Sequence, residues 1–323
     1  MNRIKKVNQL KIQPEVEVNE TEKDLFEDYF EQKIVPLVEE DNLIKERYRN
    51  PFWGYVWSII FLCSVNVLIA LFNSLMNNHP ISYEQLILFT MLALSFIFLP
   101  IRHYYREARD DIFDVFLQYY GDWKHKATGE VQLVHSPIIP AHDSVGALHN
   151  ITNDVSDVKI EIRDTFYKKK SVLFGRKFEH IVSSGIIVYL TFPIKFDGIL
   201  LMFDKTGFYR KKKYSGLEEA KPCIDIPAAN YFSSFTDNVD FAQKIMMSLF
   251  FETILDMKEA FAAKNMYLQI QDNYIRIYFE GSVLYFDSYK FWSNKIDKKK
   301  FLQMNLEFEK IFNFIPIVEA LIQ

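Results

Sequence analysis

Three histidines at seven-residue intervals are the side chains in this sequence whose types and spacing could do chemistry. They are His135, His142 and His149, and Asp143 directly follows the second of them. Imidazole and carboxylate groups together can hold a metal ion, or exchange protons near neutral pH as an acid–base pair. One hypothesis is therefore a hydrolase that uses His135, His142 and Asp143, with His149 as a further candidate metal ligand.

Two prolines in the same stretch favour a plainer interpretation. Pro137 and Pro140 break any helix, so the seven-residue spacing does not place the three imidazoles on a common face. Gly146 and the short polar residues around it are typical of a surface loop. We therefore expect a solvated loop, with no metal ion, no cofactor and no catalytic residue.

The familiar sequence motifs of enzymes do not occur elsewhere in the chain. It has 10 glycines, and none of them forms the clustered pattern that cradles a phosphate or presents a nucleophilic serine. Neither the His-Glu-x-x-His zinc motif nor a calcium-binding loop is found. Two cysteines, Cys63 and Cys223, are too few for a disulfide framework or a four-cysteine zinc site. The sequence therefore favours a protein without catalytic activity.

Charge is unevenly distributed along the chain. Its 323 residues carry 38 Lys and Arg against 42 Asp and Glu, and this net charge of -4 gives no electrostatic reason to expect nucleic acid binding. Residues 52–101 contain a single formal charge, on Glu84. A chain that is 49% hydrophobic and 25% charged does not have the composition of a disordered tail.

Two apolar runs in this poorly charged stretch are long enough to cross a membrane. They cover residues 52–76 and 81–101, and a short turn separates them. A helix rises about 1.5 Å per residue, so roughly 20 residues cross the hydrocarbon layer. Basic residues flank the pair: Lys45, Arg47, Arg49, Arg102, Arg106 and Arg109. Because the turn has none, the positive-inside rule predicts a multi-pass protein of the inner (cytoplasmic) membrane, with both termini in the cytoplasm and the lipid bilayer as a partner.

The first span carries a stripe of small and amide side chains at three- and four-residue spacing. The stripe consists of Cys63, Asn66, Ala70 and Asn73. Small residues and amides on one face allow helices to pack closely in lipid. Packing against the second span or against another copy of the chain is the first interpretation. A pore-lining face in a subunit of an oligomeric channel is the alternative.

Helices are also expected on both sides of the spans. The polar region 1–51 contains an amphipathic pattern at 21–33, which Pro36 is expected to kink or end. After the second span, residues 102–126 are predicted to form a stalk. Its amphipathic helix is expected to stop at Gly121 and could pack against the first helix.

Residues 127–323 are predicted to form one cytoplasmic α+β domain. Alternating or β-branched runs predict a mostly antiparallel sheet, and two amphipathic patterns predict helices that pack on it. The expected strands are 158–163, 185–192, 198–203, 266–271, 274–279 and a short one at 283–286. The expected helices are 240–264, with Leu249 on its apolar face, and about 297–313.

The order of several features is shared with a known family. A stalk after two spans is followed by the turn Asp143-Ser-Val-Gly146, by strands that begin at Gly185 and Gly198, and by the stretch Phe232-Ser-Ser-Phe-Thr-Asp237. Over roughly residues 100 to 295 this order resembles the bacterial domain-of-unknown-function 3137 family of two-span membrane proteins. That family has no established activity, so the resemblance implies a membrane architecture and no catalytic residues.

Runs of basic residues at the ends of predicted strands could contact anionic lipid headgroups. The residues are Lys168, Lys169, Lys170, Arg210, Lys211, Lys212 and Lys213. A solvated turn is the plainer interpretation, and nucleic acid is disfavoured because no aromatic side chains alternate with the basic ones. The function predicted from these features is a non-enzymatic, membrane-anchored interaction or regulatory module with a protein partner or self-association. A channel subunit and a membrane-tethered hydrolase are the alternatives.

Overall fold

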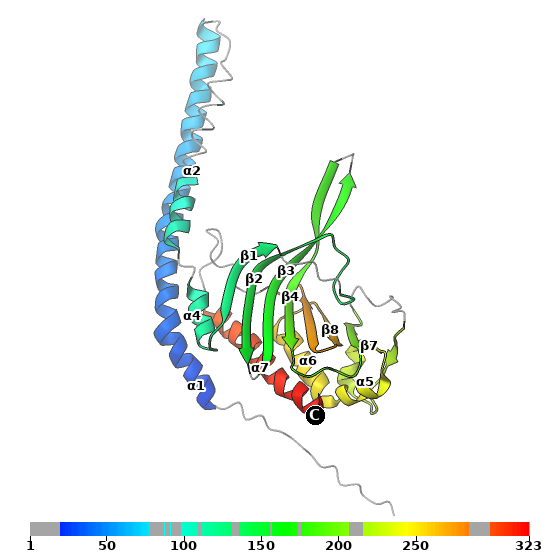
Figure 1. The fold of residues 1–323 in the computed structure, drawn as a ribbon. Helices are drawn as coiled ribbons and strands as arrows, with labels where there is room; N and C mark the ends of the chain where they lie inside the picture. The colour runs from blue at the N-terminus through cyan, green and yellow to red at the C-terminus, as the bar shows by residue number, and fades with distance from the viewer. Residues whose placement is uncertain are drawn as a thin grey trace, which may run out of the picture.

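A long N-terminal helix stands beside a broad antiparallel sheet, and further helices cover one face of that sheet (Figure 1). The structure is a computed structural model. It describes residues 20–77, 87, 91, 98–108, 111–130, 136–155, 157–173, 176–206, 216–283 and 298–322. The predicted α+β class, with a mostly antiparallel sheet, is confirmed.

The N-terminal helix is continuous over three elements. α1 (Glu20–Tyr29) passes through one π-helical turn (Phe30–Ile34) into α2 (Val35–Asn77). The helix does not end at Pro36, because the wide turn lies directly in front of this residue. There the backbone N–H of Val35 bonds to the carbonyl of Phe30, five residues back. A wider turn gives the proline ring the room that an α-helical carbonyl would occupy.

One helical run among the described residues is long and apolar enough to cross a membrane. It covers Leu25–Met76, and its most apolar stretch is not buried inside the protein at all. Large apolar side chains such as Trp57, Phe61 and Leu68 are exposed there. The predicted second span, 81–101, lies outside the described residues except at 87, 91 and 98–101. The two-span hairpin therefore stays a prediction.

Nine strands form one sheet within the described part of the chain, and neighbouring strands are antiparallel. Their order is β1-β2-β3-β4-β9-β8-β5-β7-β6. The strands are β1 (Lys124–Glu130), β2 (Ser144–Val155), β3 (Val158–Leu173), β4 (Arg176–Thr191), β5 (Leu200–Asp204), β6 (Glu218–Ala220), β7 (Phe232–Thr236), β8 (Asn265–Gln271) and β9 (Tyr274–Glu280). Five predicted strands are confirmed as β3, β4, β5, β8 and β9, although the prediction ran one residue past the end of β4 and began two residues before β5. The sixth, 283–286, lies outside the described residues apart from Val283, which is not in a strand.

β2 corrects the expectation of a loop around the histidines. Gly146 does not mark a turn but lies in this strand beneath an aromatic ring. A Cβ atom at Gly146 would lie 2.1 Å from the ring of Phe166 on β3, so a larger residue there would have to displace this ring. The segment 136–143 that precedes β2 crosses the outer face of the sheet. It places Ile138 and Ile139 in an apolar cluster with Tyr167.

The helices after the sheet's central strands differ from the predicted ones. In place of one helix over 240–264 there are two, α5 (Val239–Ile245) and α6 (Ser248–Ala260). The break at Met246 and Met247 resets the helical phase. Leu249, which was predicted to face the core, is therefore 45% exposed. The adjacent Phe250 and Phe251 are fully buried instead. The last helix, α7 (Lys298–Ile322), is longer than expected and runs through Pro316.

The predicted stalk is not one helix. Residues 98–107 are helical, Ala108 is not, and α4 (Ile112–Gln118) follows as a separate short helix with Asp111 before it. This break lets α4 turn and bury its apolar side. The predicted packing of this region against the N-terminal helix is confirmed, since the rings of Phe26 and Phe116 meet edge to face with centroids 6.3 Å apart.

The main core lies between the sheet and the helices. Apolar side chains of α1, α4, α6 and α7 meet the inner face of the strands in one cluster. Ile160 and Val188 come from the sheet, Phe251 from α6 and Phe308 from α7, and each is at most 1% exposed. Burial of each such side chain contributes roughly 1.5–3 kcal/mol. The first half of the N-terminal helix therefore belongs to the folded domain, and the second half extends from it.

Candidate functional site

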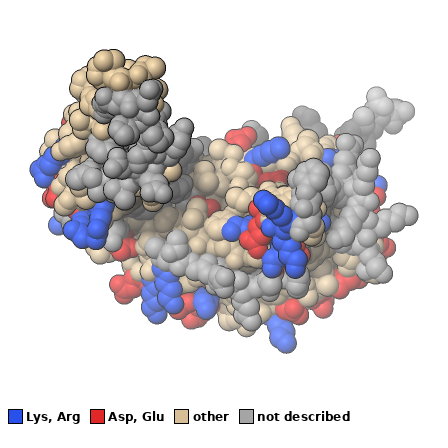
Figure 2. All heavy atoms as spheres, turned by 90° about the horizontal axis from the view of Figure 1, so that it is seen from above, with Lys and Arg blue, Asp and Glu red and all other residues tan. Residues whose placement is uncertain are grey.

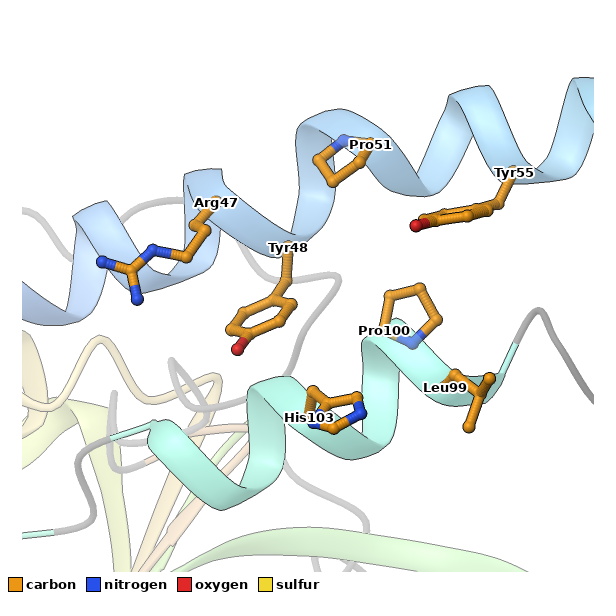
Figure 3. Close-up of a pocket in the computed structure, with 7 residues that line it drawn as sticks. All are labelled: Arg47, Tyr48, Pro51, Tyr55, Leu99, Pro100 and His103. Atoms are coloured by element: carbon orange, nitrogen blue, oxygen red, sulfur yellow. The ribbon is translucent and has the colours of Figure 1, made fainter.

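A cleft lies where the N-terminal helix leaves the domain. Its walls are α2 and the helical segment 98–107, which run side by side at this point (Figure 3). The cleft has a volume of about 380 Å³. Its lining residues are Arg47, Tyr48, Pro51, Tyr55, Leu99, Pro100 and His103. It lies next to the beginning of the apolar run at residue 52.

Polar contacts close one end of this cleft. Glu107 accepts a hydrogen bond from the hydroxyl of Tyr48, and its other oxygen lies 3.3 Å from Nη1 of Arg47. The bond to Glu107 raises the pKa of Tyr48 above its usual value. The ring of Tyr48 also stacks on His103, with planes 8° apart and centroids 6.3 Å apart. These contacts join the two helices on the domain side of the cleft.

The two ends of the cleft differ in character. Arg47, Tyr48 and His103 supply charge and hydrogen-bonding groups at the end nearer the domain (Figure 3). Pro51, Tyr55, Leu99 and Pro100 make the other end apolar. Such an arrangement suits a small amphiphile, with its polar head toward the domain and its apolar part toward the span. None of the lining residues is arranged as a nucleophile with a general base.

Buried ionisable side chains lie on the domain side of the cleft, at the joint where α2 packs against the segment 98–107. Asp41 and Lys45, one turn apart on α2, are 0% and 1% exposed, and Tyr104 of the segment 98–107 is also 0% exposed. Burial lowers the pKa of Lys45, and the nearby Asp41 carboxylate opposes this shift. Burial also raises the pKa of Tyr104. The joint is therefore a packed part of the protein and not a flexible linker.

The candidate histidines are not brought together where the structure describes them. The Nδ1 atom of His142 lies 2.7 Å from the carbonyl oxygen of Pro140, and its ring packs against Tyr167. Asp143 accepts a hydrogen bond of 2.6 Å from the backbone N–H of Lys170. His135 lies outside the described residues. Among the residues described, no group of three or more His, Cys, Asp or Glu side chains could hold a metal ion.

His149 belongs to a different cluster, and its expected place in a surface loop is wrong. It lies on β2, with Nδ1 3.1 Å from Nε2 of His125 on β1. The Nδ1 atom of His125 lies 2.9 Å from the carboxylate of Asp114 on α4. This row of three polar groups ties α4 to the edge of the sheet. No local pattern predicts it, because His125 and His149 meet only through strand pairing.

A second polar network, which the sequence did not indicate, lies among β4, β5, β8 and β9. Glu280 accepts hydrogen bonds from Asn265 at 2.7 Å and from the hydroxyl of Tyr267 at 2.9 Å. The hydroxyl of Ser183 lies 2.6 Å from that of Tyr278 and 3.3 Å from Glu280. The described network has no imidazole to take a proton from Ser183. A buried network of this kind, with its groups bonded to one another, makes the sheet rigid.

The nearby Asp204 extends this network to α6. Its carboxylate accepts hydrogen bonds from Thr206 and pairs with the ammonium group of Lys258. Burial raises the pKa of Asp204, but the bonds from Lys258 and Thr206 outweigh this effect and the pKa lies below its usual value. Asp204 is thus an ionised carboxylate with a structural partner.

The stripe on the first span is described only in part. Asn66 donates a hydrogen bond of 3.1 Å to the carbonyl of Leu62 in its own helix. Cys63 and Ala70 are partly buried, whereas Leu68 is 64% exposed. The side chain of Asn73 lies outside the described residues. Both interpretations of the stripe, packing and pore lining, stay predictions.

The basic runs have separate outcomes. Lys168, Lys169 and Lys170 lie on β3. Lys168 is the last residue of this strand that pairs with β2, and Lys169 and Lys170 lie in the part that extends beyond the rest of the sheet. The run Arg210–Lys213 lies outside the described residues. Contact of either run with lipid headgroups stays a prediction at this point.

Comparison with known proteins adds little to this picture. No family model matches the chain, and no curated protein matches it. One solved structure that matches is the crystal structure of the mycobacterial trehalose monomycolate transport factor A, TtfA. It is 10% identical, with a TM-score of 0.38, over 63% of this chain and 90% of that chain. A likeness this distant carries no argument about function. The resemblance to the domain-of-unknown-function 3137 family stays a prediction.

Proposed function

We propose that the protein is a non-enzymatic, membrane-anchored module whose α+β domain binds or regulates a partner at the cytoplasmic face of an inner membrane. The observation that carries this proposal is the N-terminal helix. Its most apolar stretch is entirely unburied, yet the same continuous helix supplies core residues to the domain. An unburied apolar helix of this length is costly in water, and a bilayer removes the cost.

The same helix supports a rigid anchor. Phe26, Phe30 and Ile34 are at most 2% exposed, because they pack against α4 and α7 in the main core. No loop separates these residues from the apolar run that begins at residue 52. The domain is therefore held in one orientation relative to the span.

The proposed topology has a second span over 81–101 and both termini in the cytoplasm. The ion pair between Arg47 and Glu107 supports it, because these residues flank the two proposed spans in the sequence and yet lie 3.3 Å apart. A chain that leaves the domain near Arg47 and returns near Glu107 must turn back in between. The basic residues on both sides of the proposed hairpin fit a cytoplasmic location of its open end.

The two alternatives have less support. For a hydrolase, His142 and Asp143 would have to face a substrate together with His135. His142 contacts the carbonyl of Pro140, Asp143 accepts a hydrogen bond from Lys170, and His135 lies outside the described residues. For a channel, Asn66 would have to offer its amide to a pore, but that amide is bonded to the backbone of its own helix. No contact described for these residues favours a hydrolase or a channel over a membrane-anchored module.

Extraction of membranes with alkaline carbonate tests the proposal. The wild-type chain is expected to stay in the membrane pellet. Replacing Leu68 and Ile69 with Arg is expected to release it, since a charge at the centre of a span costs about 3 kcal/mol. Leu25→Arg with Leu43→Arg is the matched control, because these leucines are exposed on the polar half of the same helix. Release of the wild-type chain would refute the proposal.

A further inference from the structure

A two-stranded arm extends from the sheet. β3 pairs with β2 only as far as Lys168, and β4 pairs with β9 only from Gly185 onward. Beyond these points the two strands pair only with each other, through Leu173 and Arg176. We call the described residues 168–173 and 176–182 the hairpin arm. Figure 1 shows it rising from the sheet as a narrow ribbon.

The base of the arm is sharply defined. A Cβ atom at Gly185 would lie 2.2 Å from the carbonyl oxygen of Phe279, so glycine is needed where β4 meets the sheet. Ser183 is 8% exposed and bonds to Tyr278, and Tyr167 on the opposite strand is 2% exposed. The sheet thus holds the arm firmly at its base.

Both faces of the arm are uncovered. Every residue from 176 to 182 is exposed, whereas Ile186, Ile187 and Val188 further along the same strand are fully buried. Large apolar side chains are among the exposed ones: Val172 at 67%, Phe178 at 42%, Ile181 at 60% and Val182 at 37%. A two-stranded ribbon alone is only marginally stable in water, so such a surface calls for a partner.

The charge of the arm is strongly positive. Five basic side chains stand against a single acidic one, Glu179, and the basic ones are Lys168, Lys169, Lys170, Arg176 and Lys177. The contacts of Glu179 with Lys168 and Lys170 are 3.8 and 3.9 Å long and exposed. Exposed ion pairs of this kind contribute little energy, and the hairpin arm keeps its net positive charge.

The direction of the arm decides what it meets. The arm and the upper half of α2 project from the domain toward the same side (Figure 1). Figure 2 views the protein from that side, and several groups of Lys and Arg side chains lie on this face among Asp and Glu side chains. If α2 crosses a bilayer from residue 52 onward, the arm points at the surface of that bilayer. Resting on the proposed anchoring, we infer that the hairpin arm docks onto the anionic surface of the membrane that α2 spans.

The chemistry of the arm fits a lipid surface better than a protein or a nucleic acid. Near an anionic leaflet each Lys or Arg raises the affinity about fivefold, and the effect decreases with added salt. Phe178, on the face of the ribbon that also carries Lys169 and Arg176, then enters the boundary between headgroups and acyl chains, where apolar area is removed from water. Docking at a second site would fix the height and tilt of the domain below the membrane.

The test uses the full chain in lipid nanodiscs, with Cys63→Ala, Cys223→Ser and a single cysteine at Ser171→Cys that carries a polarity-sensitive dye. Anionic phosphatidylglycerol discs are compared with phosphatidylcholine discs, each with a nitroxide quencher on the headgroup. We expect blue-shifted, quenched emission in the anionic discs alone, with reversal at high salt.

Charge reversal in the hairpin arm provides the second part of the experiment. Lys168→Glu, Lys169→Glu and Lys170→Glu together are expected to abolish the shift and the quenching. The matched control reverses Lys195, Lys221 and Lys244, which are exposed in other elements, and is expected to keep both. Phe178→Ser with Ile181→Ser is a variant of unchanged charge, and it is expected to lose the blue shift.

The outcomes separate this inference from the proposed function. Chains that fail to insert into either type of disc would refute the anchoring itself. Chains that insert, but whose dye emission is unshifted in anionic discs or equal in both types of disc, would overturn only the docking of the arm. A shift that appears only after a protein or nucleic acid is added would also overturn it, and would assign the arm to that partner.

Discussion

The hydroxyl of Tyr29 donates a hydrogen bond of 2.7 Å to the main-chain oxygen of Val115, and it thereby ties the anchoring helix to α4. The two residues lie 86 positions apart in the sequence, Tyr29 before the proposed spans and Val115 after them. Phe26 packs beside this bond, with its ring centroid 5.0 Å from that of Tyr119. In the proposed anchored arrangement, the orientation of the domain relative to the membrane depends on this contact between α1 and α4.

Phe26→Ala is expected to weaken this attachment. Phe26 is 2% exposed, and truncation of a buried phenylalanine costs about 3–5 kcal/mol because it leaves a cavity. We expect earlier unfolding of the detergent-purified chain in urea and faster proteolysis between α1 and α4. The neighbouring Leu25, which is 60% exposed, provides the control Leu25→Ala, with a change below about 0.5 kcal/mol. Equal effects of both variants would show that α1 is not part of the core.

A buried acid on α7 makes the domain less stable as the pH rises. Glu307 is 1% exposed, and burial raises its pKa to about 8 from an ordinary value of 4.5. The folded protein keeps a proton that the unfolded chain releases, so the contribution to stability is full below pH 4.5 and falls up to pH 8. Over this range the loss is on the order of 5 kcal/mol.

Glu307→Gln tests this dependence, since an amide has no proton to lose. Urea midpoints of the variant are expected to vary much less between pH 5 and pH 8 than those of the wild type. Glu319→Gln, at a partly exposed position on the same helix, is expected to retain the wild-type slope. A wild-type midpoint that stays constant or rises over this interval would contradict the assignment.

The ion pair between Lys258 and Asp204 is expected to contribute more to stability than a more exposed pair that joins α6 to α7. Lys258→Met leaves the carboxylate of Asp204, which is 3% exposed, without its charged donor, at a cost of about 2 kcal/mol. Lys310→Met breaks a pair with Asp256 that is 56% exposed on the acidic side, at a cost below about 1 kcal/mol. Similar urea midpoints for the two variants would disprove this ranking.

The central strands of the sheet could be predicted from the sequence because they obey local rules, whereas β1, β2, β6 and β7 were not predicted. Alternation over 158–163 and the two-residue turn between β8 and β9 are patterns within a few neighbouring residues. The length of β3 could not be predicted in this way. Its outer end from Lys169 onward pairs only with β4 and begins with two lysines, so no apolar alternation marks it.

The site residues were less predictable for a physical reason. His125 and His149 meet through the register of β1 and β2, and Tyr48 meets Glu107 across some sixty residues of chain. Spacing along the sequence carries no information about such contacts. The seven-residue spacing of His142 and His149 was misleading, because one lies before β2 and the other within it.

The central claim is that the domain is anchored with its bulk on the cytoplasmic side, and native Cys223 tests it most directly. This cysteine is exposed in the domain, and Cys63 lies in the apolar run. A membrane-impermeant maleimide is applied to spheroplasts and to lysed membranes, with Cys223→Ser as the control for specificity. A cysteine introduced at position 78, in the predicted turn, reports the opposite side. We expect Cys223 to react only after lysis and the cysteine at position 78 to react in intact spheroplasts. Labelling of Cys223 in intact spheroplasts would contradict the account.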